Sequence, residues 1–372
     1  MDTKPAILYS RSAVVTDWTC PRKRFYNYEY MGRGITPNET FLELFLGQTV
    51  HDGLAAIAHD IPIDDICTAG IQQLKENILT SMSGQHNVEY FANEQAALVE
   101  GMLRGFHRII WPTMKHQYPD VVAVEQEMVY EHDGLTFLAK PDLIVRDREG
   151  CLWYVEYKTT STNKEQWINS WQTAVQLHSS VRAVEATLNE KVTGVVVQGL
   201  YKGYVSYEKQ NSPFCYAYHK PGEPPFTKEQ WAYDYKPGLK KYPVWEKEGG
   251  VKAWVLGMPE FVLSGQFPQV PPIFLNEHLI DRFFKQQSNR EHVIRSARNV
   301  IATTDNDEIR QRMLDDTFPQ HFEACNPGWG KGCAYRKLCH GLAKDPLEAG
   351  FTMRTSHHEL EENALNAASS GE

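Results

Sequence analysis

The chain has 372 residues, of which 42% are hydrophobic and 23% charged, a composition typical of a globular protein with a core. Its formal net charge of −9 excludes an overall basic surface, so a nucleic-acid ligand would need a local basic groove. No apolar run approaches the ~18 residues of a membrane helix, and the first ten residues lack the features of an export signal. We therefore expect a cytoplasmic protein with no membrane partner, located in the host cytoplasm if the source is viral.

Taken in chain order, the first predicted elements are helical. A polar start precedes an aromatic-rich helix from Trp18 to Tyr30, and residues 41–59 place apolar side chains at helical spacing. Residues 66–83 and 90–117 predict two further helices. The N-terminal third of the chain is thus expected to supply helices rather than strands.

The periodicity then changes from helical to two-residue alternation. Three strands are predicted at Val121–Tyr130, Leu135–Val145 and Leu152–Thr159. A helix over 164–188 follows, and Val192–Leu200 has the apolar centre of a buried strand. This order predicts an α/β fold with a mixed sheet flanked by helices.

The C-terminal half is less regular. Residues 201–272 are rich in Pro, Gly, Tyr and Trp and predict an irregular insertion, whereas residues from about 276 to 316 predict helix. We expect one domain over 1–345, followed by a disordered polar tail over 346–372. Within the domain we expect a core at about 41–200, the insertion at about 201–272, and a helical, cysteine-rich closing segment at 273–345.

Two carboxylates and a lysine mark the predicted hairpin. Asp142 follows Lys140 and Pro141, and thirteen residues separate it from Glu156, with Lys158 two positions further on. Neighbouring strands would bring the carboxylates together, and the spacing of two places Glu156 and Lys158 on one face. Carboxylate oxygens bind hard cations such as Mg²⁺ or Mn²⁺, and a nearby ammonium can orient a water molecule.

The alternative is an ordinary solvated hairpin with an ion pair. Glu and Lys are depleted in strands, yet here they follow the apolar run Leu152-Trp153-Tyr154-Val155. Charged side chains in such a strand need a reason, and a metal site supplies one.

This segment resembles the PD-(D/E)XK nucleases, which have a restriction-endonuclease-like fold, and specifically their RecB-like exonuclease branch. The resemblance implies that Asp142 and Glu156 bind the metal and that the carbonyl of Tyr157 is a backbone ligand. It also implies that Lys158 supports the attacking water. The similarity covers about residues 8–200 and 318–341.

Two flanking motifs agree with this branch. Gly47-Gln48-Thr49-Val50-His51 is similar to its helical G-x-x-x-H element, whose histidine completes the metal site. After the lysine strand the branch carries a Q-x-x-x-Y helix, and here Gln172 and Gln176 are four residues apart. We favour Gln176 as the substrate contact, although Ser180 stands where the tyrosine is expected; Gln172 is the second candidate, and a polar helix face is the alternative.

Four cysteines form a second candidate metal site. Cys325, Cys333 and Cys339 lie close together, and Cys20 stands in Cys-Pro-Arg-Lys near the N-terminus. Four thiolates suit a 4Fe–4S cluster or Zn²⁺, while scattered buried thiols are the alternative. The pattern resembles the iron–sulphur staple of AddB-type and CRISPR-associated exonucleases, which implies a cluster joining the two ends of the chain.

Basic residues beside these cysteines are candidates for DNA contacts. They would converge if the cysteines joined, although charge runs are as often simply solvated. The candidates are Arg22, Lys23, Arg24, Lys331 and Arg336.

The resemblance implies a Mg²⁺- or Mn²⁺-dependent deoxyribonuclease, and more narrowly an exonuclease acting on single strands or DNA ends. A role in recombination, repair or replication, a helicase or recombination partner, and a phage source are implied only by analogy. The alternatives are a structure-specific endonuclease and a non-catalytic DNA-binding subunit of a helicase–nuclease complex.

Overall fold

The computed structural model describes residues 8–38, 42–83, 88–161, 164–171, 174, 176–202, 267–325, 332–343 and 345–370. The strands in these residues are β1 (Leu8–Ser10), β2 (Ile35–Pro37), β3 (Asp120–Val124), β4 (Met128–His132), β5 (Leu135–Ala139), β6 (Leu143–Arg146), β7 (Leu152–Thr160), β8 (Val192–Tyr201) and β9 (Phe351–Met353). The helices are α1 (Arg11–Thr19), α2 (Pro21–Arg24), α3 (Leu42–Ala58), α4 (Ile63–Ser81), α5 (Val88–Gly105), α6 (Trp111–Gln117), α7 (Lys164–Trp171), α8 (Gln176–Leu188), α12 (Glu277–Thr303), α13 (Asp307–Thr317), α14 (Arg336–Cys339) and α15 (Glu359–Ser370).

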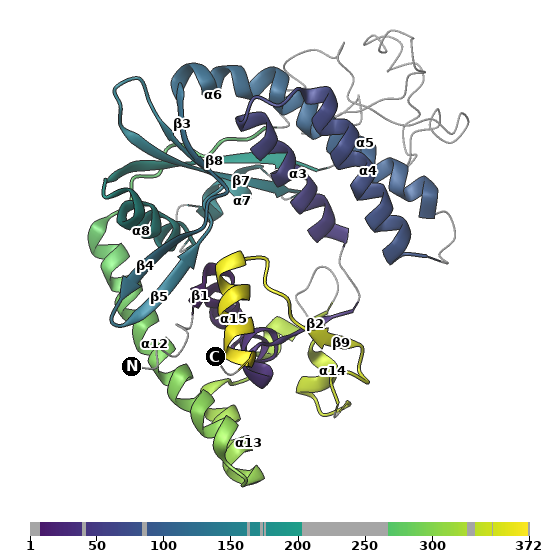
Figure 1. Ribbon diagram of the computed structural model, residues 1–372, viewed down its shortest axis with the longest axis vertical. Helices are drawn as coiled ribbons and strands as arrows, with labels where there is room; N and C mark the ends of the chain where they lie inside the picture. Colours follow the sequence, from purple (N-terminus) through teal and green to yellow (C-terminus); the bar gives the residue numbers. More distant parts are fainter. Residues whose placement is uncertain are drawn as a thin grey trace.

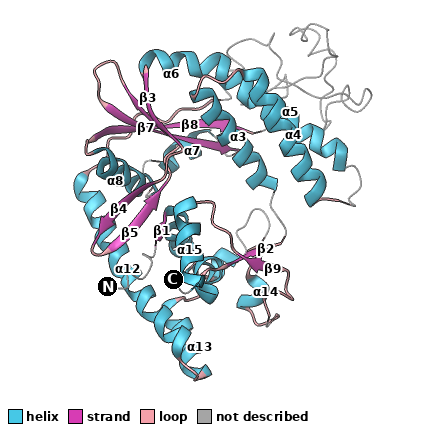
Figure 2. Cartoon of the chain, viewed as in Figure 1, coloured by secondary structure: helices cyan, strands magenta, loops and turns pink. Residues whose placement is uncertain are grey.

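Strands β3, β6, β7 and β8 form a mixed sheet in that order, and helices surround it (Figures 1 and 2). β6 runs antiparallel to β3 and β7, whereas β7 and β8 are parallel. A second sheet has the order β1-β5-β4, and β2 pairs with β9. The predicted fold class, a mixed α/β fold with helices flanking the sheet, is confirmed.

Two of the predicted strands are each divided in the structure, and this is a correction. Val121–Tyr130 divides into β3 and β4, and Leu135–Val145 divides into β5 and β6. The first break contains Glu125, whose φ is 48°. The second contains Pro141, which has no N–H to donate to a strand ladder. At these breaks the chain passes between the two sheets, so Asp142 lies just before β6 rather than inside a strand.

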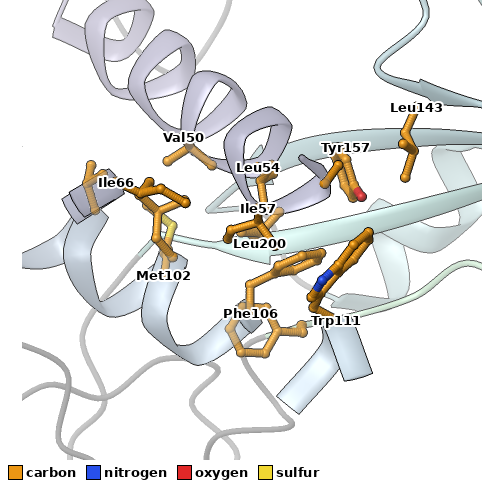
Figure 3. Close-up of a cluster of buried hydrophobic side chains, with 14 of the residues drawn as sticks. Val50, Leu54, Ile57, Ile66, Met102, Phe106, Trp111, Leu143, Tyr157 and Leu200 are labelled. Atoms are coloured by element: carbon orange, nitrogen blue, oxygen red, sulfur yellow. The ribbon is translucent and has the colours of Figure 1, made fainter. Parts of the chain in front are cut away.

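Both faces of the central sheet are buried. On one face, α3, α4 and α5 pack over apolar side chains of the sheet, and Val50, Leu54, Met102, Phe106 and Leu200 belong to one buried cluster there (Figure 3). On the other face, α7 and α8 pack against the alternate side chains of β7 and β8, including Tyr154 and Val197. Period-two alternation between two apolar environments explains the continuous apolar run in these strands.

The C-terminal half returns to the N-terminal segments. The carbonyl of Pro268 accepts a hydrogen bond from the amide of Gly199, so the chain after residue 267 runs beside β8. α12 then packs Phe283 and Phe284 against β1 and β5. The amide of Arg22 donates to the carbonyl of Pro319 at 3.2 Å. Segments from the two ends of the sequence therefore lie side by side.

Several predicted boundaries are wrong. The helix from Trp18 to Tyr30 is interrupted at Cys20, whose extended backbone separates α1 from α2. The predicted 90–117 helix has a π-helical turn at Phe106–Ile110, between α5 and α6. The helix over about 276–316 is two helices, since Asn306 caps a new helix by accepting from the amides of Glu308 and Ile309.

The expected disordered tail over 346–372 is also wrong. β9 pairs antiparallel with β2, and α15 follows it. Arg354 in this segment is buried, lies over the ring of Tyr28 and pairs with Glu361. The buried polar side chains of this segment pair with one another, as the hydroxyl of Ser356 does by donating to Glu361. Most of the predicted 201–272 insertion, residues 203–266, lies outside the described residues. None of the helices described has the length and apolar content of a membrane span.

Candidate active site

The β6–β7 hairpin brings two carboxylates together. Leu143 pairs with Val155 across this antiparallel ladder, so the preceding Asp142 faces Glu156 on the next step. The amide of Tyr157 donates to Oδ2 of Asp142 at 2.6 Å, which holds the aspartate against β7. Asp142 is 8% exposed and Glu156 is fully buried. A local ladder therefore builds the predicted pair, while the role expected for the Tyr157 carbonyl stays a prediction.

Three side chains surround the Glu156 carboxylate. Nζ of Lys158 lies 2.7 Å from Oε1, on the same face of β7, as the spacing predicted. Nη1 of Arg11 lies 3.2 Å from the same oxygen, and the hydroxyl of Tyr154 donates to Oε2. Burial alone would raise the pKa of Glu156, but Arg11 and Lys158 outweigh it and lower the pKa to about 2. Glu156 is therefore ionised at neutral pH.

His51 reaches this site from helix α3. Its Nδ1 lies 3.2 Å from Oδ1 of Asp142 and 3.6 Å from Oε1 of Glu125. Burial alone would lower the pKa of His51, but the charge of Asp142 and hydrogen bonds to Asp142 and Glu125 raise it to about 10. α3 packs beside β7 through Val50 and Leu54, which places His51 next to the carboxylates.

Glu125 belongs to the site but was not singled out from the sequence. Its Oε2 lies 3.1 Å from Nζ of Lys140, and its φ of 48° is unusual for a residue other than glycine. Glu127, two residues further on, has other partners: its carboxylate accepts from the amides of Glu359 and Leu360 at the start of α15.

These residues fit a divalent cation. One ligand atom from each of His51, Glu125 and Asp142 lies within 4.8 Å of the others. The set combines hard carboxylate oxygens with one imidazole. These ligands suit Mn²⁺, and the carboxylates also suit Mg²⁺, which prefers oxygen to nitrogen ligands. Each carboxylate is matched by a cation of the protein: Lys140 at Glu125, His51 at Asp142, and Lys158 with Arg11 at Glu156. A bound ion would release the proton of His51.

The predicted glutamines are not placed by the structure. Gln172 and the side chain of Gln176 lie outside the described residues, although Gln176 is the first residue of α8. Their proposed contact with substrate stays a prediction.

The four cysteines predicted to hold a cluster share one region. Cys20 separates α1 from α2, and the amide of Cys333 donates to the carbonyl of Cys325 at 2.9 Å. Burial raises the pKa of Cys339 to about 12, and the neighbouring thiols of Cys333, Cys20 and Cys325 also raise it. The four thiols are thus near enough to influence one another, while the metal that they are predicted to hold stays a prediction.

Two of the basic residues expected to contact DNA are buried, which is a correction. Nε of Arg22 donates to the carbonyl of Phe318 at 2.7 Å, and its guanidinium pairs with Asp315. Arg24 is 1% exposed and pairs with Glu29 and Glu291. Both arginines connect the N-terminal helices to the C-terminal half.

The other basic candidates differ in their surroundings. Lys23 is partly exposed and Arg336 is exposed, so both face solvent near the cysteines. Lys331 lies outside the described residues.

Comparison with known proteins gives one match to a family. A family model described as the PD-(D/E)XK nuclease superfamily matches residues 9–340. No curated protein matches the chain. The matched region contains His51, the Asp142–Lys158 hairpin and all four candidate cluster cysteines.

Proposed function

Because the chain belongs to the PD-(D/E)XK nuclease superfamily, which supports a metal-dependent nuclease activity, we propose that it is a Mg²⁺- or Mn²⁺-dependent DNA exonuclease of the RecB-like branch. The observation that carries this proposal is the convergence of Asp142, Glu156 and Lys158 with His51, an arrangement built from two strands and a helix. Two carboxyl groups, a lysine and an imidazole in one place are the groups that metal-assisted phosphodiester hydrolysis needs.

The side chains divide the work as follows. Asp142, Glu156, His51 and Glu125 would hold the metal, which supplies an activated water and polarises the phosphodiester. Lys158 lies beside Glu156 and orients the attacking water while stabilising negative charge on the phosphate. Burial of Glu156 strengthens these electrostatic effects, because there is little solvent to screen them.

The test is a nuclease assay with end-labelled single- and double-stranded DNA, with and without Mn²⁺. Glu156→Gln and Lys158→Ala should each reduce hydrolysis by about 10²–10⁴-fold. Lys115→Ala is a matched control, since Lys115 of α6 forms an exposed ion pair with Asp60, which follows α3. Hydrolysis that persists at the wild-type rate in both site variants would overturn the assignment.

Exonuclease action is separated from its main alternative by the form of the DNA. An exonuclease degrades linear DNA and leaves covalently closed circles intact, whereas a structure-specific endonuclease cuts closed substrates that carry a junction or flap. A non-catalytic DNA-binding subunit would bind both and cut neither. The cytoplasmic location, the phage source and a helicase or recombination partner also remain proposals, supported by the resemblance to the RecB-like branch.

We further propose that Cys20, Cys325, Cys333 and Cys339 hold a 4Fe–4S cluster that joins the two ends of the chain, with Zn²⁺ as the alternative. The proximity of the four thiols supports it. Anaerobic purification followed by iron, sulphide and zinc analysis separates the two metals. Cys339→Ser should lose metal and soluble protein together, while Cys151→Ser, outside the group, should lose neither; retention of both by Cys339→Ser would contradict a structural cluster.

A further inference from the structure

Arg11 is held in the candidate active site although 145 residues separate it from Glu156. It is the first residue of α1, directly after β1. Ser10 pairs with Leu138 in the β1–β5 ladder and is buried, and its hydroxyl accepts from the amide of Ala13 at the start of the helix. The backbone that carries Arg11 is therefore fixed by a strand on one side and a capped helix on the other.

The Arg11 side chain pairs with the buried acid and is itself partly exposed. Nη1 of Arg11 is 3.2 Å from Oε1 and 3.3 Å from Oε2 of Glu156. The Arg11 side chain is 23% exposed, whereas that of Glu156 is fully buried. Within the described residues Glu156 is its only hydrogen-bond partner, so most of its five N–H donors are uncommitted.

Glu156 has other partners besides Arg11. Lys158 already lies 2.7 Å from Oε1, and the Tyr154 hydroxyl donates to Oε2. Two partly exposed cations thus pair with one carboxylate, and Arg11 carries the planar fork of donors that matches two phosphate oxygens. Arg11 also lies within electrostatic reach of Asp142 and Glu125. Burial alone would lower the pKa of Arg11, but the negative charges of Glu156, Asp142 and Glu125 raise it.

We propose that Arg11 is a phosphate-binding residue of the active site, contacting the DNA backbone next to the metal ligands. This inference rests on the proposed nuclease function. Its guanidinium transfers hydrogen bonds from Glu156 to a backbone phosphate when DNA enters, while Lys158 remains on Glu156. The alternative is a purely structural ion pair that keeps Glu156 in position.

DNA binding without hydrolysis distinguishes these roles. Fluorescence anisotropy with labelled single- and double-stranded oligonucleotides, in EDTA and over a range of salt concentrations, compares wild type with Arg11→Ala and Arg11→Lys. Arg104→Ala is the control: its side chain is 24% exposed and also pairs with carboxylates, but on α5.

Arg11→Ala should weaken DNA binding by about tenfold and reduce the slope of log K against log salt by about 0.7–0.9. Arg11→Lys should keep most of the slope but recover only part of the affinity, because an ammonium lacks the bidentate fork. Arg104→Ala should stay close to wild type. Equal affinity and slope for wild type and Arg11→Ala would overturn the proposal.

A second measurement, Mn²⁺ binding to the DNA-free protein by calorimetry, tests the structural alternative. Arg11→Ala should bind Mn²⁺ at least as tightly as wild type, because a cation that competes for Glu156 is gone. Weaker Mn²⁺ binding with unchanged DNA affinity would make Arg11 a positioning residue instead. If Arg11→Ala does not fold, Arg11→Gln keeps the polar contact and is measured in its place. If wild type neither binds nor cuts DNA, the proposed function fails; if only the variant difference is missing, the Arg11 inference alone fails.

Discussion

Arg24→Met should be strongly destabilising, although the sequence suggested a DNA contact for this residue. Nη1 and Nη2 of Arg24 donate to the two carboxylate oxygens of Glu291 at 3.0 Å each, and Nε donates to Glu29 at 3.0 Å. The side chains of Arg24, Glu29 and Glu291 are 2%, 2% and 0% exposed. The substitution therefore leaves buried carboxylates without their main counter-charge.

Glu29 and Glu291 differ in the partners that remain after Arg24 is replaced. Glu29 keeps its ion pair with Arg298, whereas the one other hydrogen bond of Glu291 within the described residues comes from the side-chain amide of Gln287, at 2.7 Å. Leaving one buried charge uncompensated costs about 3–5 kcal/mol, which is a large share of the ~5–15 kcal/mol that stabilises a typical protein. Arg24→Met/Glu291→Met removes the orphaned charge and should regain most of that loss.

The assay is urea unfolding followed by circular dichroism, with DNA affinity measured on the same preparations. Arg33→Met is the control, because its ion pair with Glu362 is more exposed and should contribute less than about 1 kcal/mol. An Arg24→Met protein that unfolds within 1 kcal/mol of wild type would refute the reasoning. If that protein also lost DNA affinity, the original interpretation of Arg24 as a DNA contact would be right.

Three further predictions concern strain, packing and pH. Glu125→Gly should change the free energy of unfolding by less than about 1 kcal/mol, because relief of the positive φ offsets the added entropy of the unfolded chain. Calorimetry should nevertheless show weaker Mn²⁺ binding. Unaltered Mn²⁺ affinity would show that Glu125 is not a ligand. Gly199→Ala should cost about 1–3 kcal/mol, since its Cβ would lie 2.7 Å from a tryptophan side chain, whereas Gly47→Ala, with no atom within 4 Å, should be neutral or stabilising in thermal melts. Burial lowers the pKa of His358 despite its contact with Glu127. As the pH falls, the unfolded chain therefore takes up a proton at His358 before the folded chain does. The stability that neutral His358 contributes is present above pH ~6.5 and is lost as the pH falls below that value. The stability of a His358→Gln protein should decline less over that range, and an identical decline would show that His358 is not responsible.

The part of the site that could be predicted is the part that depends on local geometry. Asp142, Glu156 and Lys158 lie on one hairpin, where a two-residue period and an antiparallel ladder determine which side chains meet. His51 was accessible through a motif on one helix. Glu125 was missed because its role depends on a backbone conformation with positive φ, and no residue type at that position announces it.

Arg11 could not have been found in the same way. Its contact with Glu156 spans 145 positions and depends on the pairing of β1 with β5. β1 has three residues and is too short to produce a clear period. The basic run from Arg22 to Arg24 was interpreted wrongly for a related reason. The sequence does not show whether a charged side chain will be buried or which residue it will pair with, because both depend on the packed chain.

By itself, the order of residues determined the fold class and the hairpin that carries Asp142, Glu156 and Lys158, since these follow from local period and spacing. Only the tertiary structure decided which charged side chains face the site and which are buried, how Pro141 and Glu125 divide two strands between two sheets, and that the polar C-terminal segment packs onto β2 and the N-terminal helices. The physical reason is that these features depend on contacts between residues far apart in the chain. Ion pairs such as Arg11–Glu156 and Arg24–Glu291 form only when the whole fold brings their partners together.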